Sequence, residues 1–258
     1  MNNKNIIITG ATGNIGSHLC DYLAAKGYNL ILVSRTLDKL ILLQDELNYK
    51  YKVSIDILAI DFENDNCYNE LLTLCEKKQI IDGLVLVPPK IPATTNCFPD
   101  NEVWMNIFHK VFVKPLEFVK IVMPYLEANT QRSKVVIISG ISSVQALPAY
   151  AINNVLRTAW LGQAKSLALF YGEKGIHFNS LSLGGVLTEA FLEKLTQESL
   201  ETGIPVNEMI ADKVNNVPLK KYASLNEVSI AIETLLSNFT DHITGSNITL
   251  DGGFIKTY

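Results

Sequence analysis

Cysteine and histidine are scarce in this sequence, and neither residue clusters. The four residues of each type stand without paired spacing: Cys20, Cys67, Cys75, Cys97, His18, His109, His177 and His242. Structural zinc sites and dithiol redox centres need close pairs such as Cys-x-x-Cys, and the sequence contains none. We therefore expect reduced thiols of the kind found in cytosolic proteins, and no bound metal.

Long apolar runs and an excess of one charge are missing as well. The 258 residues include 22 Lys and Arg against 26 Asp and Glu, which gives a net charge of −4. A basic face for nucleic acid or for an anionic membrane is therefore not expected. The apolar runs are far shorter than the ~18 residues of a transmembrane helix, and residues 1–10 lack the cleavage site of a signal peptide. We expect a cytoplasmic protein that binds neither nucleic acid nor membranes.

What the sequence does contain is a regular alternation of strand-like and helix-like segments. The predicted strands are 5–10, 29–34, 53–62, 81–87, 134–139, 176–184 and 247–253. The predicted helices are 17–27, 37–48, 66–78, 101–128, 150–172 and 225–237, with more helical sequence up to 216. Continuously apolar strands separated by helices are typical of a parallel sheet covered on both faces. We predict one domain over 1–258, a doubly wound α/β fold of Rossmann type with about seven strands.

The sharpest motif is TGATGNIG at 9–16, between the first predicted strand and the first predicted helix. Gly10 permits a tight turn, Gly13 lets the backbone approach a pyrophosphate, and Gly16 allows close packing of helix on strand. The remaining predicted contacts to the nucleotide come from the same loop: Thr12, Asn14 and Ile15. An ordinary glycine-rich turn is the alternative, but the position between strand and helix favours nucleotide binding.

The ends of the second and third strands predict which nucleotide is bound. Ser34 and Arg35 stand where a carboxylate would select NAD(H), and a guanidinium can grip a 2′-phosphate. We therefore expect NADP(H) in preference to NAD(H). Asp61 and the backbone of Phe62 are placed to contact the adenine. The alternatives are a solvated charge for Arg35 and a cap of the next turn for Asp61.

Five segments together resemble the short-chain dehydrogenase/reductase family over almost the whole chain. They are TGATGNIG at 9–16, SR at 34–35, DF at 61–62, GIHFNSLSLGGVLT at 175–188 and ITGSNITLDGG at 243–253. The resemblance implies that Gly184, the Val186 backbone and the Thr188 hydroxyl lie beside the nicotinamide. It also implies a homo-oligomer, either a tetramer or a dimer, with the DGG tail packed at subunit contacts.

The usual catalytic positions of that family fall on other side chains here. Counted back from AKSLA at 164–168, the places of the family's Ser, Tyr and Lys fall on Gly140, Asn153 and Arg157. The place of the helix Asn that completes its proton relay falls on Val111. We therefore expect the common tetrad to be absent.

A second spacing resembles the enoyl-thioester reductase branch of the same family. That branch has Pro-x-Tyr followed by Lys seven positions after the Tyr, and this chain has Pro148, Tyr150 and Arg157. It also has a further Tyr where this chain has Gly140. An offset of seven puts Tyr150 and Arg157 on one helix face. The resemblance implies that Tyr150 stabilises or protonates the substrate oxygen and that Arg157 holds the nicotinamide ribose. Three hydroxyls are candidate helpers: Ser139, Ser142 and Ser143.

The function expected from these features is NADP(H)-dependent reduction of a conjugated C=C or a C=O in a small or carrier-bound acyl substrate. Two alternatives stay open. One is ordinary ketone reduction with Tyr150 as the proton donor. The other is a nucleotide-binding protein without turnover, with a scaffolding or regulatory role, in which Tyr150 is only a packed aromatic at a helix start.

Segment 189–216 lies where the family places a substrate lid. Five apolar side chains of this segment are candidates for lining an apolar pocket: Phe191, Leu192, Leu195, Met209 and Ile210. Helix packing or a subunit contact is the alternative role for them.

Overall fold

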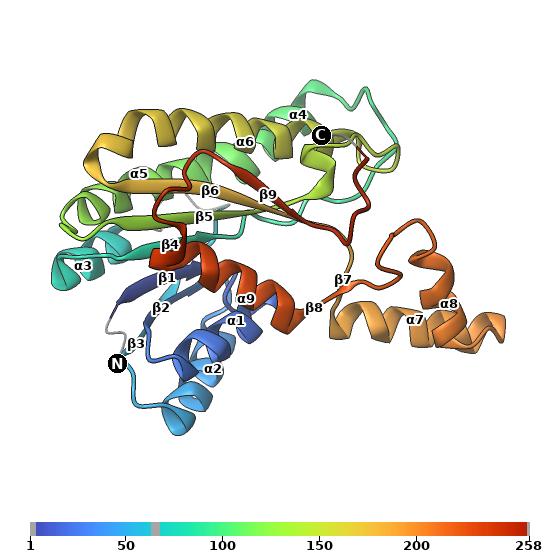
Figure 1. Cartoon of the computed structure of the whole chain (residues 1–258), viewed down its shortest axis with the longest axis horizontal. Coiled ribbons are helices and arrows are strands. Elements are labelled where there is room, and N and C mark those ends of the chain that lie inside the picture. The colour runs from blue at the N-terminus through green and yellow to red at the C-terminus, as the bar shows by residue number, and fades with distance from the viewer. Residues whose placement is uncertain (1–3, 63–67, 257–258) are drawn as a thin grey trace.

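The fold is organised around a sheet of seven strands in which every paired neighbour runs parallel. The computed structural model describes residues 4–62 and 68–256, and its strand order is β3-β2-β1-β4-β5-β6-β9 (Figure 1). The strands are β1 Asn5–Thr9, β2 Asn29–Ser34, β3 Ile55–Ala59, β4 Gly83–Leu86, β5 Ser133–Gly140, β6 Ile176–Leu183 and β9 Asn247–Leu250. The order reverses between β1 and β4, so the doubly wound prediction is confirmed, and ligands are expected at this switch point.

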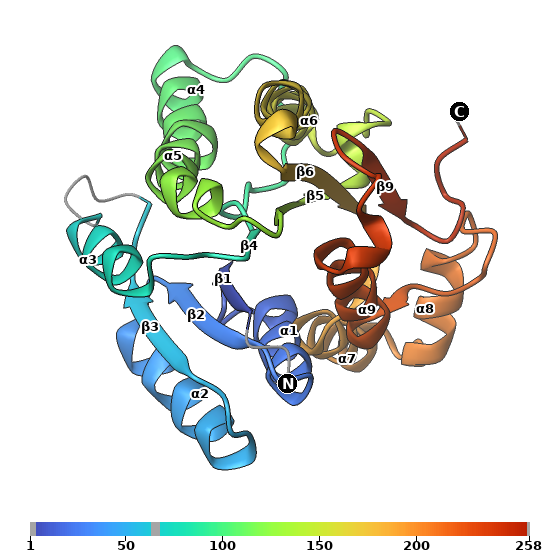
Figure 2. The same cartoon turned by 60° about the vertical axis from the view of Figure 1, so that its left-hand side comes forward.

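Helices cover both faces of the sheet (Figure 2). One face carries α3 Asn69–Lys78, α5 Lys114–Glu127 and α6 Ala151–Tyr171. The other carries α1 Asn14–Ala25, α2 Leu37–Lys50 and α9 Leu225–Leu236. Away from the sheet faces, β7 Val186–Leu187 pairs with β8 Ala223–Ser224, and α7 Glu189–Thr202 and α8 Val206–Lys213 lie between those two strands in the chain.

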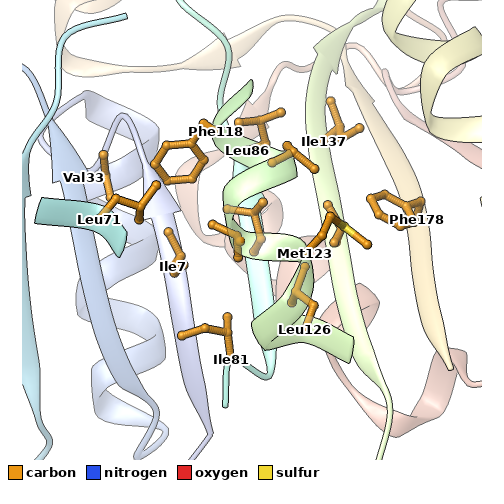
Figure 3. Close-up of a cluster of buried hydrophobic side chains, with 14 of the residues drawn as sticks. Ile7, Val33, Leu71, Ile81, Leu86, Phe118, Met123, Leu126, Ile137 and Phe178 are labelled. Atoms are coloured by element: carbon orange, nitrogen blue, oxygen red, sulfur yellow. The ribbon is translucent and has the colours of Figure 1, made fainter. Parts of the chain in front are cut away.

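Alternation along each strand divides the buried side chains into two cores. In β1, Ile7 packs under α3 and α5, whereas Ile6 and Ile8 pack under the helices of the opposite face. Figure 3 shows the first core, in which Phe118 and Met123 of α5 lie over the strands. Each such side chain contributes about 1.5–3 kcal/mol through burial, so the unbroken apolar strands stabilise both layers at once.

The predicted helical stretch 101–128 is present as an uninterrupted helix over 101–127, but its middle is wider than an α-helix. The structure has α4 Asn101–Phe108, a π-helical turn at His109–Val113, and then α5. Pro115 is the physical reason, since it has no N–H to donate to the Val111 carbonyl one turn earlier. That carbonyl instead accepts a hydrogen bond from Trp160 Nε1 at 3.0 Å.

Most other predicted boundaries differ only at their ends. Helix α1 begins at Asn14 rather than 17, and β3 covers 55–59 rather than 53–62. The first residues of the predicted helix 66–78, and Cys67, lie outside the described residues. The three described cysteines, Cys20, Cys75 and Cys97, are free thiols. Burial raises the pKa of Cys75 to about 11, which keeps it protonated and unreactive.

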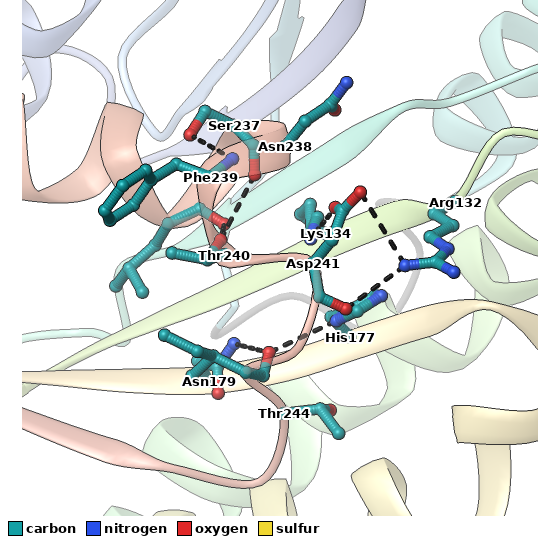
Figure 4. Close-up of polar contacts among 12 residues, drawn as sticks. Arg132, Lys134, His177, Asn179, Ser237, Asn238, Phe239, Thr240, Asp241 and Thr244 are labelled. Carbon is teal, nitrogen blue, oxygen red and sulfur yellow. Dashed lines mark hydrogen bonds and ion pairs between the residues drawn. The ribbon is translucent and has the colours of Figure 1, made fainter.

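An ion-pair cluster ties the starts of β5 and β6 to the connection between α9 and β9 (Figure 4). The buried Lys134 ammonium donates to Asp241 at 2.8 Å, and Arg132 donates to the Asp241 carbonyl at 3.1 Å. His177 Nδ1 donates to the Ile243 carbonyl at 3.2 Å. The Lys134 hydrogen bond is the main reason that the pKa of Asp241 is lowered. This polar cluster lies at the amino ends of the strands and leaves the opposite end for ligands.

Within residues 4–62 and 68–256, no helix has the length and apolar character needed to cross a membrane. The same residues contain no group of three or more His, Cys, Asp and Glu side chains that could hold a metal ion.

Candidate functional site

Two adjoining cavities lie at the carboxyl ends of the strands. The first, of about 480 Å³, lies over β1, β2 and β3, and the second, of about 560 Å³, lies over β4, β5 and β6. Both are lined by the stretch 87–90 that follows β4. The two cavities therefore form one cleft across the switch point, and we name them the outer cavity (β1–β3) and the inner cavity (β4–β6).

The glycine-rich loop is the floor of the outer cavity, and its geometry explains its glycines. Gly10 has a φ of +64°, which L side chains rarely adopt. A Cβ on Gly16 would lie 2.1 Å from the Gly10 carbonyl oxygen, so only glycine lets α1 approach the loop. Thr9 Oγ1 accepts from Val87 N at 2.7 Å and donates to Val87 O at 3.1 Å, which locks the loop to the end of β4.

The start of α1 is left open for an anion. Its N-cap residue is Gly13, no side chain caps it, and its first turn has no acidic residue. Thr12 and Ser34 share a hydrogen bond of 2.6 Å that joins the loop to the end of β2. The first N–H groups of a helix attract phosphate when nothing else caps them. The loop therefore fits the pyrophosphate of a dinucleotide.

Four cations line the outer cavity, of which the sequence predicted one. Arg35 is joined there by residues that the sequence analysis missed: Lys39, Lys90 and Lys110. Arg35 and Lys39 are exposed, and neither forms an ion pair or hydrogen bond with a described residue. Lys39 lies in the first turn of α2, four positions after Arg35, which precedes the helix.

Asp61 and Phe62 line the same cavity, as expected for the adenine end. The Phe62 ring is buried and packs edge-on against Phe118, with centroids 5.8 Å apart. Only its backbone is then available to a ligand. Asn14 and Gly16 do not line either cavity, and Gly16 acts through packing alone.

Tyr150 and Arg157 share the wall of the inner cavity. Tyr150 is the N-cap residue of α6, and the Arg157 guanidinium carbon lies 6.0 Å from the centre of its ring. Arg157 Nη1 donates to Ser142 Oγ at 3.0 Å. A Cβ on Gly140 would lie 2.4 Å from that same Nη1, so the guanidinium occupies the space of a missing side chain. Burial lowers the pKa of Arg157, although a guanidinium stays protonated in proteins.

The three serine hydroxyls predicted to assist catalysis differ in whether they face the inner cavity. Ser139 lines the inner cavity, and its buried Oγ has no hydrogen-bond partner in the described part of the chain. Ser142 does not line the cavity and acts as the acceptor for Arg157, while Ser143 is turned toward Ser182 at 2.8 Å. Asn153 is fully buried and donates to the Ile91 carbonyl at 3.2 Å, outside both cavities.

The opposite wall depends on two glycines after β6. A Cβ on Gly184 would lie 2.8 Å from Asp251 Cα, and one on Gly185 would lie 2.3 Å from the Tyr222 ring. Gly184 and Val186 line the inner cavity, together with Ile15 of the glycine-rich loop. Thr188 does not line it, because its Oγ1 accepts from Phe191 N and caps α7.

Three residues of this wall were not predicted from the sequence: Lys213, Tyr222 and Phe254. The Tyr222 hydroxyl donates to the Lys213 carbonyl at 3.2 Å, and burial raises the pKa of this phenol. No local pattern marks these residues: the pairing of β7 with β8 brings Tyr222 to the site, and Phe254 belongs to the segment after β9.

The five apolar side chains proposed for the lid segment do not line the inner cavity. Leu195 and Met209 are buried, and Phe191 packs edge-on against Tyr222 with centroids 5.6 Å apart. Leu195, Met209 and Phe191 therefore fit the alternative role given above, which is packing of the helices.

A sequence model of the enoyl-(acyl carrier protein) reductase family matches residues 10–255. The chain is 26% identical to the uncharacterized oxidoreductase YmfI of Bacillus subtilis, over 98% of this chain and 99% of that protein. It is 44% identical to a very-long-chain 3-oxoacyl-CoA reductase of Candida glabrata over only 72 residues, which are 27% of this chain and 20% of that protein. The second relationship is therefore local.

The fold is similar to that of L-sorbose reductase from Gluconobacter frateurii, solved in complex with NADPH and L-sorbose. The TM-score is 0.91 at 22% sequence identity, over 100% of this chain and 98% of that one. Together with the family match over 10–255 and the seven-stranded sheet, these similarities place the chain in the enoyl-(acyl carrier protein) reductase family of short-chain dehydrogenases/reductases, a superfamily of oxidoreductases.

Proposed function

We propose that the protein uses NADP(H) to reduce a conjugated C=C or a C=O bond of a small or carrier-bound substrate. The observation that carries the proposal is the pair Tyr150 and Arg157 on one wall of the inner cavity, 6.0 Å from ring centre to guanidinium carbon. A phenol and a cation beside the end of the nucleotide cleft are the groups that a developing oxyanion needs.

The outer cavity supports NADP(H) rather than NAD(H). Among the described residues, its cations are Arg35, Lys39, Lys90 and Lys110, against one carboxylate, Asp61. A 2′-phosphate would find charge-assisted donors at the end of β2, where an NAD-selective site would present a carboxylate to the ribose. The open start of α1 supports the pyrophosphate of either cofactor.

A bound dinucleotide would supply a hydride from the reduced nicotinamide. Tyr150 would donate a hydrogen bond or a proton to the substrate oxygen, because no described residue takes its hydroxyl hydrogen bond. Arg157, whose guanidinium carbon lies 6.0 Å from the centre of the Tyr150 ring, would help to stabilise the negative charge that develops on the substrate oxygen. Because a guanidinium does not release its proton, stabilisation of the oxyanion is favoured over a proton relay.

The experiment has two steps. NADPH and NADH are titrated by fluorescence, and NADPH oxidation is then followed with enals, enones, enoyl thioesters and ketones. Tighter binding of NADPH and turnover of one substrate class are expected. Binding of NADPH without turnover of any class would instead support the nucleotide-binding protein without redox activity.

We also propose a homo-oligomer, either a tetramer or a dimer. On α6, Leu169 and Phe170 are 77% and 73% exposed, and apolar side chains on a helix surface are a common feature of subunit contacts. Light scattering at micromolar concentration tests this, and a monomer would contradict it.

A further inference from the structure

Arg157 differs from three other poorly exposed cations in having no carboxylate partner. The side chains of Lys134, Lys114 and Lys78 are 4%, 7% and 16% exposed, and they pair with carboxylates at 2.8, 3.0 and 2.7 Å. No described carboxylate forms an ion pair with Arg157, whose hydrogen bond goes to the neutral Ser142 hydroxyl. Taking a cation out of water without a counter-charge is costly, so this position calls for an anion.

The surroundings hold the guanidinium in place. Gly140 leaves room for it at the end of β5, where any larger residue would place its Cβ within 2.4 Å of Nη1. The Tyr150 ring lies on another side. The cation is therefore built into the wall of the inner cavity, rather than attached to it by a side chain that is free to turn toward solvent.

No described residue of the inner cavity forms an ion pair with Arg157. Lys90 and Lys213 line the same cavity, and the one acidic residue among its lining residues is Asp251. The Asp251 carboxylate is engaged by the backbone N–H groups of Gly253 and Ile255, both at 2.9 Å. The phosphates of a dinucleotide would be met by the cations of the outer cavity and by the start of α1. Ribose hydroxyls are neutral and would leave the charge of Arg157 uncompensated.

The rest of the inner cavity is mainly apolar. Its lining includes Val111, Ile138, Leu156 and Trp160. A cation in the wall of a mainly apolar cavity fits a ligand that carries one anionic group on an otherwise apolar molecule. A guanidinium binds a carboxylate with two parallel hydrogen bonds, whereas a thioester, ester or amide brings no charge.

We propose that the substrate is a free carboxylic acid with an apolar body and that its carboxylate pairs with Arg157. The proposal rests on the function proposed above and narrows it, because it favours an unsaturated or oxo acid over a carrier-bound thioester. The reducible bond lies next to the carboxylate, so that the oxygen contacted by Tyr150 stays within reach of the charge of Arg157.

The test compares an acid with its amide, which has nearly the same shape and no charge. Binding of 3-phenylpropanoate and 3-phenylpropanamide is measured by calorimetry, with the protein saturated with NADP⁺ and again without cofactor. We expect the acid to bind about 10- to 100-fold more tightly than the amide, the range for a hydrogen-bonded charge. Arg157→Gln should abolish this preference. Arg157→Lys keeps the charge but lacks the two parallel N–H donors of the guanidinium, so it should retain part of the preference. Arg132→Gln, at the opposite end of β5, is the matched control and should keep it whole.

Equal affinities for acid and amide, no binding of the acid, or a preference that survives Arg157→Gln would each overturn the proposal. The titration with NADPH tests the proposed function independently of the acid–amide comparison. Failure of cofactor binding would overturn the proposed function, while the acid–amide comparison on the protein without cofactor would still decide the role of Arg157.

Discussion

The two ends of the cleft are built in different ways. The outer cavity is floored by backbone from one short stretch, the loop 9–16, and flanked by the end of β2. The inner cavity gathers side chains from β5, α6, β6, the approach to β8 and the segment after β9. In the proposed function, one end would therefore bind its ligand largely through main-chain N–H groups, and the other through side chains that only the complete fold brings together.

The starts of two helices show the same contrast. Helix α1 begins at Gly13 without a side-chain cap, so its first N–H groups are left for a ligand. Helix α9 begins with a full capping box, in which Ser224 Oγ accepts from Glu227 N and the Glu227 carboxylate accepts from Ser224 N. The cap stabilises the inner end, where β8 leads into α9, and removes that helix start as an anion site.

The largest expected effect is at the inner end. Tyr150→Phe removes the hydroxyl that we propose contacts the substrate oxygen and should lower turnover about 10²- to 10⁴-fold. The affinity for NADPH should not change, because the ring remains. Steady-state kinetics and fluorescence titration measure the two quantities. Tyr222→Phe is the comparison within the same wall and should cost less, since that hydroxyl is engaged by the Lys213 carbonyl. Turnover that survives Tyr150→Phe would contradict the assignment.

Gly16→Ala tests the backbone construction of the outer end. A methyl group 2.1 Å from the Gly10 carbonyl oxygen forces the loop away from α1. Overpacking of this kind costs about 1–3 kcal/mol, which would weaken NADPH and NADH alike by about 5- to 150-fold. Gly162→Ala is the control, because a Cβ there meets no atom within 4 Å. Unchanged cofactor affinity in Gly16→Ala would show that the loop does not bind the nucleotide.

Arg35→Ala sharpens the comparison further, since it should affect one cofactor and leave the other. Loss of a charge-assisted contact to a 2′-phosphate should weaken NADPH by about 1–3 kcal/mol. NADH lacks that phosphate, and its affinity should stay nearly constant. Calorimetry with both cofactors measures the difference. Parallel weakening of NADPH and NADH would place Arg35 near a shared part of the two molecules.

The smallest expected effect is on stability and concerns the cap of α9. Hydrogen bonds from Lys221 and then from Ser224 lower the pKa of Glu227 from 4.5 to about 2. Because the folded-state pKa is the lower one, the stabilisation is fully present above pH 4.5 and is lost as the pH falls toward about 2. Glu227→Gln should therefore lower Tm modestly at pH 7, and the difference from the wild type should shrink between these pH values. Thermal unfolding followed by circular dichroism measures both curves. A difference in Tm that stays constant with pH would argue against this carboxylate as the source.

The sequence predicted the outer end better than the inner end, for a physical reason. The residues of 9–16 contact one another within one short loop, so their spacing in the sequence already indicates the shape of the loop. The seven-stranded parallel sheet was predictable on the same grounds, because each strand is a continuous apolar run. The cations Lys90 and Lys110 come from separate segments that only the sheet order brings to the end of β2.

The inner end was predictable only in part. The offset of seven places Tyr150 and Arg157 on one face of α6, and both line the inner cavity. The position of the guanidinium against Gly140, and the wall formed by Tyr222, depend on contacts across the sheet and between β7 and β8. Pro115 explains the π-helical turn within 101–128, since a proline inside a helix removes one backbone donor.

The π-helical turn at His109–Val113 makes the length of this segment as important as its composition. A π-turn closes its hydrogen bond over one residue more than an α-turn. Deletion of a single residue here would restore a regular helix, and α4 and α5 would keep nearly the same relative rotation because the wider turn absorbs the extra residue. The change would be local: the widened turn that presents the Val111 carbonyl to Trp160 and places Val111 in the cavity wall would be lost. A one-residue change in length at this turn therefore reshapes the inner cavity without any substitution among the residues that line it.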